Sequence, residues 1–99
     1  AVQLAEDADV LIHEATFAHQ DAEMAFRRLH STSTMAAQTA LAANAHRLII
    51  THFSPRYNPG NPIEFKDLLK EARAIFPKTD MAYDFMSYEV PRRRDSIIV

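Results

Sequence analysis

The residues best able to do chemistry in this chain are histidines and a carboxylate that stand just after short apolar runs. Glu14 follows an apolar run that ends in His13, and His52 follows a second such run. His30 stands in a polar break between them. Imidazole binds zinc and serves as a general acid or base, and a carboxylate can orient an imidazole and support its protonated form. These residue types therefore indicate metal binding or proton transfer.

Each of these residues also has a structural explanation, which the sequence leaves open. A histidine at a strand end more often makes a hydrogen bond or lies on the surface than binds a metal. His30 precedes two hydroxyl residues, Ser31 and Thr32, that can cap the start of a following helix. Glu14 could be a solvated loop acid. His52 alone cannot hold zinc, because a hydrolytic zinc site takes about three protein ligands.

The other polar candidates are expected to be structural. We place His19 and His46 on the surface and interpret Asp84 as a strand-end or turn acid. The arginines at 92–94 form a basic run near the end of the chain. Such a run is most simply a solvated tail, and contact with phosphate is the alternative.

The elements that must position these residues alternate between strand and helix. The expected strands are 9–13, 47–51 and 80–90, the last broken near Asp84, and the expected helices are 21–29, 34–45 and 62–76. The last helix has the clearest start, with Asn61 as N-cap and Glu64 completing a capping box. The order strand-helix-helix-strand-helix-strand predicts an α/β layer structure. Because parallel strands share an edge at their carboxyl ends, Glu14, His30 and His52 can converge there.

Composition limits the class of protein. The chain has 99 residues, of which 47% are hydrophobic, enough for one small domain or part of a larger one. Its net charge of −2 gives no overall attraction to nucleic acid, and the absence of cysteine excludes disulfides and thiolate metal sites. No apolar run approaches a membrane span, and no signal peptide is visible. The single glycine, Gly60, and the start at Ala1 suggest a piece of a larger protein.

Four segments together resemble one family. In chain order they are His13-Glu14-Ala15-Thr16, His30-Ser31-Thr32, the stretch 48–57 around His52, and Ala82-Tyr83-Asp84-Phe85. In this order and at this spacing they resemble the C-terminal part of ribonuclease Z. Members of that family are metallo-β-lactamase-fold endonucleases that trim the 3′ end of precursor tRNA. The resemblance covers essentially the whole chain.

The resemblance implies roles for individual residues. His52 would bind one ion of a two-zinc site that activates a water and neutralises the transition state. His30 would stand beside the scissile phosphate, where it stabilises charge or donates a proton to the leaving oxygen. Glu14 would hold and polarise His30 through a hydrogen bond, and Ser31 and Thr32 would lie near the tRNA acceptor end.

Two residues of the first motif receive no catalytic role. The resemblance leaves the functions of His13 and Thr16 less clear, and we do not expect either to be catalytic.

The resemblance also implies a partner sequence. The family's HxHxDH motif, a further metal histidine and a bridging aspartate are expected upstream of Ala1, and the tRNA-gripping arm is absent. Residues 1–91 are therefore expected to form the C-terminal half of a metallo-β-lactamase αββα sandwich, with 92–99 as a basic, mobile tail. The N-terminal half of the same enzyme would complete the site. The intact protein would be a cytoplasmic homodimer that binds precursor tRNA, and the isolated chain would be inactive.

Two other functions remain open. A related metallo-hydrolase of the same fold could act on small esters or sulfates, although the loop His30-Ser31-Thr32 argues against it. A truncated, non-catalytic module that binds or dimerises is the other, and the missing metal ligands favour it for the isolated polypeptide.

Overall fold

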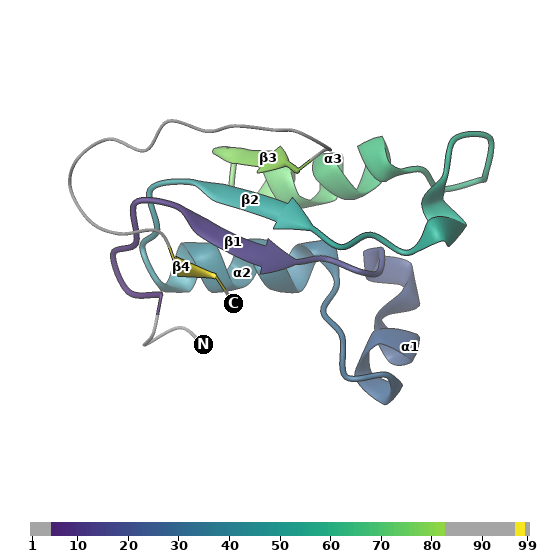
Figure 1. The fold of residues 1–99 in the computed structure, drawn as a ribbon, viewed down its shortest axis with the longest axis horizontal. Coiled ribbons are helices and arrows are strands. Elements are labelled where there is room, and N and C mark those ends of the chain that lie inside the picture. Colours follow the sequence, from purple (N-terminus) through teal and green to yellow (C-terminus); the bar gives the residue numbers. More distant parts are fainter. Residues whose placement is uncertain (1–4, 83–96, 99) are drawn as a thin grey trace.

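A computed structural model describes residues 5–82 and 97–98, and it shows strands and helices in alternation (Figure 1). The elements are β1 (Leu11–Glu14), η1 (His19–Asp21), α1 (Ala22–Arg27), α2 (Ser33–Ala42), β2 (Leu48–Thr51), η2 (Pro55–Tyr57), α3 (Phe65–Ile75), β3 (Thr79–Met81) and β4 (Ile97–Ile98). The predicted α/β class is confirmed. None of the helices in the described ranges combines the length and apolar character that crossing a bilayer requires.

The strands form one parallel sheet in the order β3-β2-β1-β4. In the central pair, Leu11 lies opposite Leu48 and Glu14 lies opposite Thr51, so β1 and β2 end in register. Their arrowheads point to the same end of the molecule (Figure 1). The ladder therefore fixes where residues that follow the two strands emerge.

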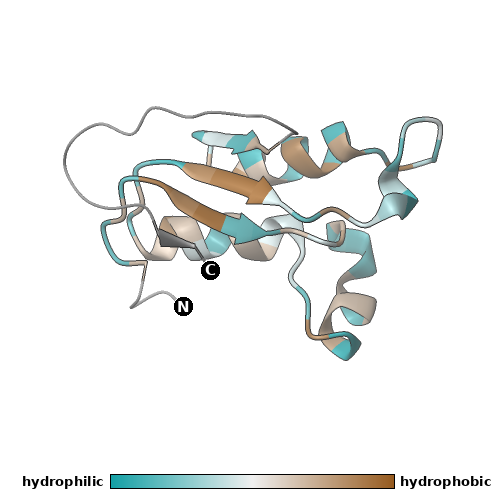
Figure 2. Cartoon of the chain, viewed as in Figure 1, coloured by the Kyte–Doolittle hydropathy of each residue, from teal (hydrophilic) through white to brown (hydrophobic). Residues whose placement is uncertain are grey.

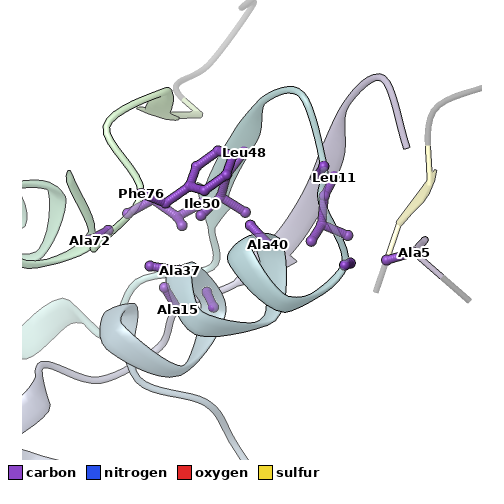
Figure 3. Packing of buried hydrophobic residues seen from close by; sticks show 12 residues of the cluster. Ala5, Leu11, Ala15, Ala37, Ala40, Leu48, Ile50, Ala72 and Phe76 are labelled. Carbon is purple, nitrogen blue, oxygen red and sulfur yellow. The ribbon is translucent and has the colours of Figure 1, made fainter. Parts of the chain in front are cut away.

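The apolar centres of the strands pack against α2, a helix whose buried side chains are small. Figure 2 shows the apolar character of β1 giving way to polar residues at its tip, whereas β2 stays apolar for most of its length. Leu11, Leu48 and Ile50 are fully or almost fully buried, and they join buried alanines of α2 in one core cluster (Figure 3). The α3 residue Ala72 and the following Phe76 close this cluster. Because an alanine side chain is a single methyl, α2 can approach the sheet closely.

The polar break before α2 caps that helix as predicted. Thr32 is the N-cap, and its hydroxyl accepts the backbone N–H of Met35 at 3.1 Å. This bond satisfies one of the unpaired donors at the start of a helix. It also fixes the chain directly after His30.

The predicted start of the last helix was wrong by a few residues. α3 begins at Phe65 with Glu64 as N-cap, and Asn61 lies outside the helix. The Asp67 carboxylate accepts the backbone N–H of Glu64 at 2.8 Å, so the reciprocal cap forms three residues later than the proline signal suggested.

Two helices also end earlier than predicted. Leu29 and Asn44, just past the ends of α1 and α2, have φ angles of 59° and 56°. A right-handed helix cannot continue through a left-handed residue, so each helix stops before it.

The end of the chain tests the sequence interpretation only in part. β3 occupies Thr79–Met81, and Ile97–Ile98, within the predicted tail, form β4 beside β1. The expected strand beyond residue 82, with Asp84 and the arginines at 92–94, lies outside the described residues.

Candidate active site

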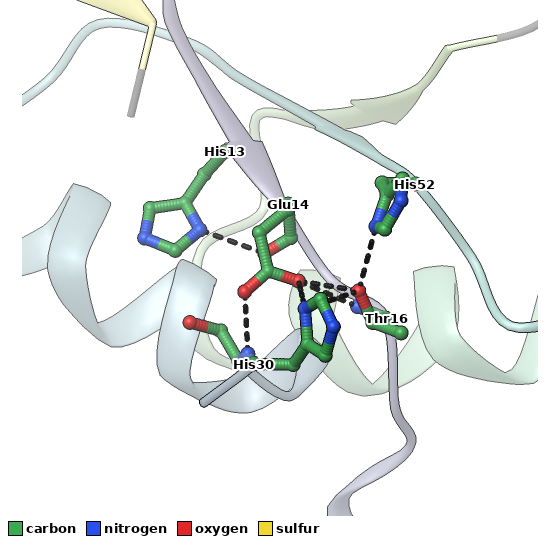
Figure 4. Close-up of polar contacts among 6 residues, drawn as sticks. His13, Glu14, Thr16, His30 and His52 are labelled. Atoms are coloured by element: carbon green, nitrogen blue, oxygen red, sulfur yellow. Dashed lines mark hydrogen bonds and ion pairs between the residues drawn. The ribbon is translucent and has the colours of Figure 1, made fainter. Parts of the chain in front are cut away.

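The carboxyl ends of β1 and β2 bring the chemistry-bearing residues together. Glu14 ends β1, and His52 follows β2 directly. His52 has a φ of 62°, a left-handed conformation that is uncommon outside glycine and that turns the chain sharply. Its ring lies over this edge of the sheet, facing Thr16 (Figure 4).

Thr16 stands at the centre of the group. Its hydroxyl lies 2.6 Å from Oε2 of Glu14, 2.9 Å from Nδ1 of His52 and 3.4 Å from Nδ1 of His30. The side chain is buried, with 7% of its surface exposed. Three segments that are distant in the chain therefore meet on one hydroxyl.

Glu14 is held by donors from two segments. Oε1 accepts the backbone N–H of Ser31 at 2.5 Å, and Oε2 accepts both the hydroxyl and the backbone N–H of Thr16, the latter at 3.1 Å. Partial burial by itself raises the pKa of Glu14, but these hydrogen bonds outweigh burial and hold the pKa below its ordinary value. The carboxylate is therefore charged at neutral pH.

His30 stands beside this carboxylate and remains accessible to solvent. Its Nδ1 lies 3.7 Å from Oε2 of Glu14, and its side chain is 37% exposed. The ring sits edge-on to Phe17 at 6.0 Å and lies 5.6 Å from the ring of His52. The His30 ring therefore faces the Glu14 carboxylate on one side and solvent on the other.

The other predicted residues of the two motifs have different surroundings. Ser31 reaches the site through its backbone, whereas the Thr32 side chain is fully buried and caps α2. Their contact with a substrate stays a prediction. His13 is buried with Nδ1 2.7 Å from the Glu14 carbonyl oxygen, and its ring points away from the cluster (Figure 4).

Sequence reasoning missed the central position of Thr16. A signal existed in its spacing from Glu14, because an acid and a hydroxyl two residues apart past a strand end can form a local hydrogen-bonded turn. What the sequence could not supply was the approach of His52 from a segment 36 residues away.

The donor atoms of Glu14, His30 and His52 lie within 4.8 Å of one another, and imidazole and carboxylate are zinc ligands. Two donors on one zinc stand at most about 4.4 Å apart, and His30 Nδ1 already lies 3.7 Å from Glu14 Oε2. Among the described residues no hydrogen bond engages Nε2 of His52 or of His30, so each ring can offer that nitrogen to a metal. Glu14, in contrast, already accepts three hydrogen bonds.

Known proteins resemble the chain closely. It is 83% identical over 95 residues to ribonuclease Z of Nostoc punctiforme, a match that covers 96% of this chain and 30% of the relative. With ribonuclease Z of Gloeothece citriformis the identity is 69% over 99 residues, covering 100% of this chain and 31% of the relative. The chain thus spans about 30% of the length of the curated relatives that it matches. These matches confirm the resemblance that the sequence segments indicated.

A solved structure agrees with the sequence relatives. Human tRNase Z, short form, is 36% identical with a TM-score of 0.68, and the match covers 91% of this chain and 27% of that one. No family model matches the chain.

Proposed function

We propose that this chain supplies part of the active site of a zinc-dependent endonuclease. Nearly the whole of the chain is similar to ribonuclease Z. The substrate would be precursor tRNA, from which the enzyme removes the 3′ trailer. The described sheet and helices would form one half of a metallo-β-lactamase αββα sandwich. The remaining strands and metal ligands would come from sequence beyond these 99 residues.

One observation carries the proposal: two imidazoles and a charged carboxylate gather around a buried hydroxyl at the carboxyl edge of the sheet. Open α/β sheets bind their ligands at this edge. A perturbed carboxylate next to an accessible imidazole is also typical of acid–base catalysis.

His30 and Glu14 would act as a pair. The Glu14 carboxylate, 3.7 Å from the ring, would orient His30. When the phosphorus–oxygen bond breaks, His30 would donate its proton to the leaving oxygen, which then departs as a neutral hydroxyl. Afterwards the ring would regain a proton from solvent, to which it is open.

His52 would serve as a ligand through Nε2 to one ion of a two-zinc centre. Zinc supplies, when bound, a positive charge near the phosphate and acidifies a coordinated water. A hydrolytic zinc ion takes about three protein ligands, so His52 would share its ion with residues from outside this chain. For that reason we propose that the isolated chain is inactive.

Further partners follow from the same proposal. Phe26 and Leu29, in and just after α1, expose 79% and 92% of their surfaces, and large apolar side chains exposed close together are typical of an interaction surface. Cover by the rest of the enzyme or by a second subunit would remove this exposure. We propose a homodimer that works in the cytoplasm.

His30→Ala in the complete protein tests the function. Cleavage of a precursor tRNA should fall about 10²- to 10⁴-fold, the range for loss of a general acid, while two zinc ions per chain are retained. The assay pairs tRNA cleavage with metal analysis by atomic emission. Normal turnover of His30→Ala would contradict the role of His30.

The wild-type complete protein separates the alternative functions. Hydrolysis of a generic phosphodiester or ester without cleavage of precursor tRNA would favour a related metallo-hydrolase. No zinc and no hydrolysis of any of these substrates would favour a non-catalytic module.

A further inference from the structure

The hydrogen bonds of Thr16 determine where its one hydroxyl proton must lie. Oγ1 is 2.6 Å from Glu14 Oε2, the shortest of its contacts, and 2.9 Å from His52 Nδ1. An ionised carboxylate can only accept hydrogen bonds, so the Thr16 hydroxyl donates to Glu14. That single donation uses its only proton.

The bond to His52 must therefore run in the opposite direction. With its proton directed at Glu14, the Thr16 oxygen can only accept, and His52 Nδ1 must carry the hydrogen. A neutral imidazole protonated on Nδ1 has its lone pair on Nε2. The contact to His30 Nδ1, at 3.4 Å, is too long to fix the tautomer of that ring in the same way.

We propose that Thr16 is a positioning residue whose hydroxyl, directed by Glu14, holds His52 in the Nδ1-protonated tautomer and leaves Nε2 free to bind a metal. This inference rests on the proposed function for the identity of the metal. The tautomer itself follows from contacts within the chain.

The surroundings of His52 explain why a hydrogen bond is needed to select its tautomer. His52 is exposed, and its left-handed backbone keeps the ring at the surface of the edge. In water the Nε2-protonated form of a neutral imidazole competes with the Nδ1-protonated form, and only the latter can bind zinc through Nε2. Thr16 is buried, and its own backbone N–H is bonded to Glu14 at 3.1 Å, so its hydroxyl is held in place. A fixed acceptor at Nδ1 selects the ligand form and its orientation.

Nitrogen NMR of histidine-labelled complete protein tests the tautomer directly. In metal-free wild type, at a pH where the imidazole is neutral, His52 should show the proton on Nδ1. A predominant Nε2-protonated form in wild type would overturn the proposal, and this measurement needs no variant.

Two substitutions at Thr16 test the consequence for metal binding. Thr16→Val keeps the shape but removes the hydroxyl, and it should mix the His52 tautomers and weaken zinc binding about 10- to 100-fold in a chelator competition. Thr16→Ser keeps the hydroxyl and should stay within about threefold of wild type in the same competition. Unchanged zinc affinity and tautomer in a folded Thr16→Val protein would overturn the proposal.

The outcome is distinguishable from failure of the proposed function. A complete wild-type protein that binds no zinc or leaves precursor tRNA intact would remove the nuclease assignment. The metal-free tautomer of His52 would still decide the role of Thr16.

Discussion

The two ends of the sheet use the same backbone conformation for different purposes. At the amino end, Asp7 and Asn44 have φ angles of 57° and 56°, and at the carboxyl end His52 has 62°. Asn44 closes α2, donating its backbone N–H to Leu41 O at 3.2 Å, and its side chain donates to Asp7 at 3.0 Å. Left-handed residues at the amino end thus join a helix to the adjoining loop.

The carboxyl end uses its left-handed residue to direct a ring. His52 caps no helix, and its Nδ1 instead contacts Thr16, 36 residues away. The hydrogen bonds at the amino end join largely backbone groups, and most side-chain substitutions leave backbone groups intact. The carboxyl end depends on particular side-chain atoms, so substitutions there should affect chemistry before they affect folding.

The largest expected difference between the ends is in the histidines. In the complete protein, His52→Ala should lose one of two zinc ions and at least about 100-fold in tRNA cleavage, above the range for residues that only support a ligand. His46→Ala, at the amino end, is the matched control and should keep both ions and its activity. Equal losses in the two variants would remove the functional distinction between the ends.

Tyr57→Phe should give an intermediate effect, on stability. The Tyr57 hydroxyl, on a residue 2% exposed, accepts the Ala18 backbone N–H at 2.8 Å and donates to Asp21 at 2.5 Å. Removing it leaves a buried donor unpaired, which costs about 1–3 kcal/mol of unfolding free energy. Denaturant unfolding of the complete protein measures this, and a loss below about 0.5 kcal/mol would show that the loop after His52 is not held by this bond.

The same tyrosine predicts a dependence on alkaline pH. Burial, together with the hydrogen bond to Asp21, raises the pKa of Tyr57 from 10.0 to about 12. Because the folded pKa exceeds the unfolded pKa, the neutral Tyr57 hydroxyl stabilises the folded state. This contribution is complete below pH 10 and is lost as pH rises toward 12. The unfolding free energy of wild type should therefore fall over that window more steeply than that of Tyr57→Phe. Parallel pH profiles would contradict the assignment.

The smallest effect is expected at Asn44. Asn44→Gly should change stability by less than about 0.5 kcal/mol, since glycine adopts a left-handed conformation without strain. Asn44→Ala should cost about 1–2 kcal/mol, because alanine lacks the short polar side chain with which asparagine offsets the strain of a left-handed conformation. Thermal unfolding of the two variants compares them, and equal stability would mean that the amino end tolerates strain.

Much of this arrangement was predictable from the sequence. The apolar runs predicted parallel strands, and parallel strands bring Glu14 and His52 to one edge. The position of Thr16 between them was not predictable, because it depends on a turn after β1 and on the approach of β2. The start of α3 was misplaced because Pro62 mimics a first helical position, whereas the Glu64–Asp67 pair forms the actual cap.

The packing of α2 has a consequence for tolerance to substitution. Ala36, Ala37 and Ala40 have no exposed surface, so any larger side chain there would push the helix outward. The amide of Ser31, which binds Glu14, stands just before that helix. Methyl-sized side chains thus act as a spacer that sets how far the segment with His30 and Ser31 stands from Glu14. A library that keeps every polar residue but enlarges these alanines should lose activity through misalignment alone.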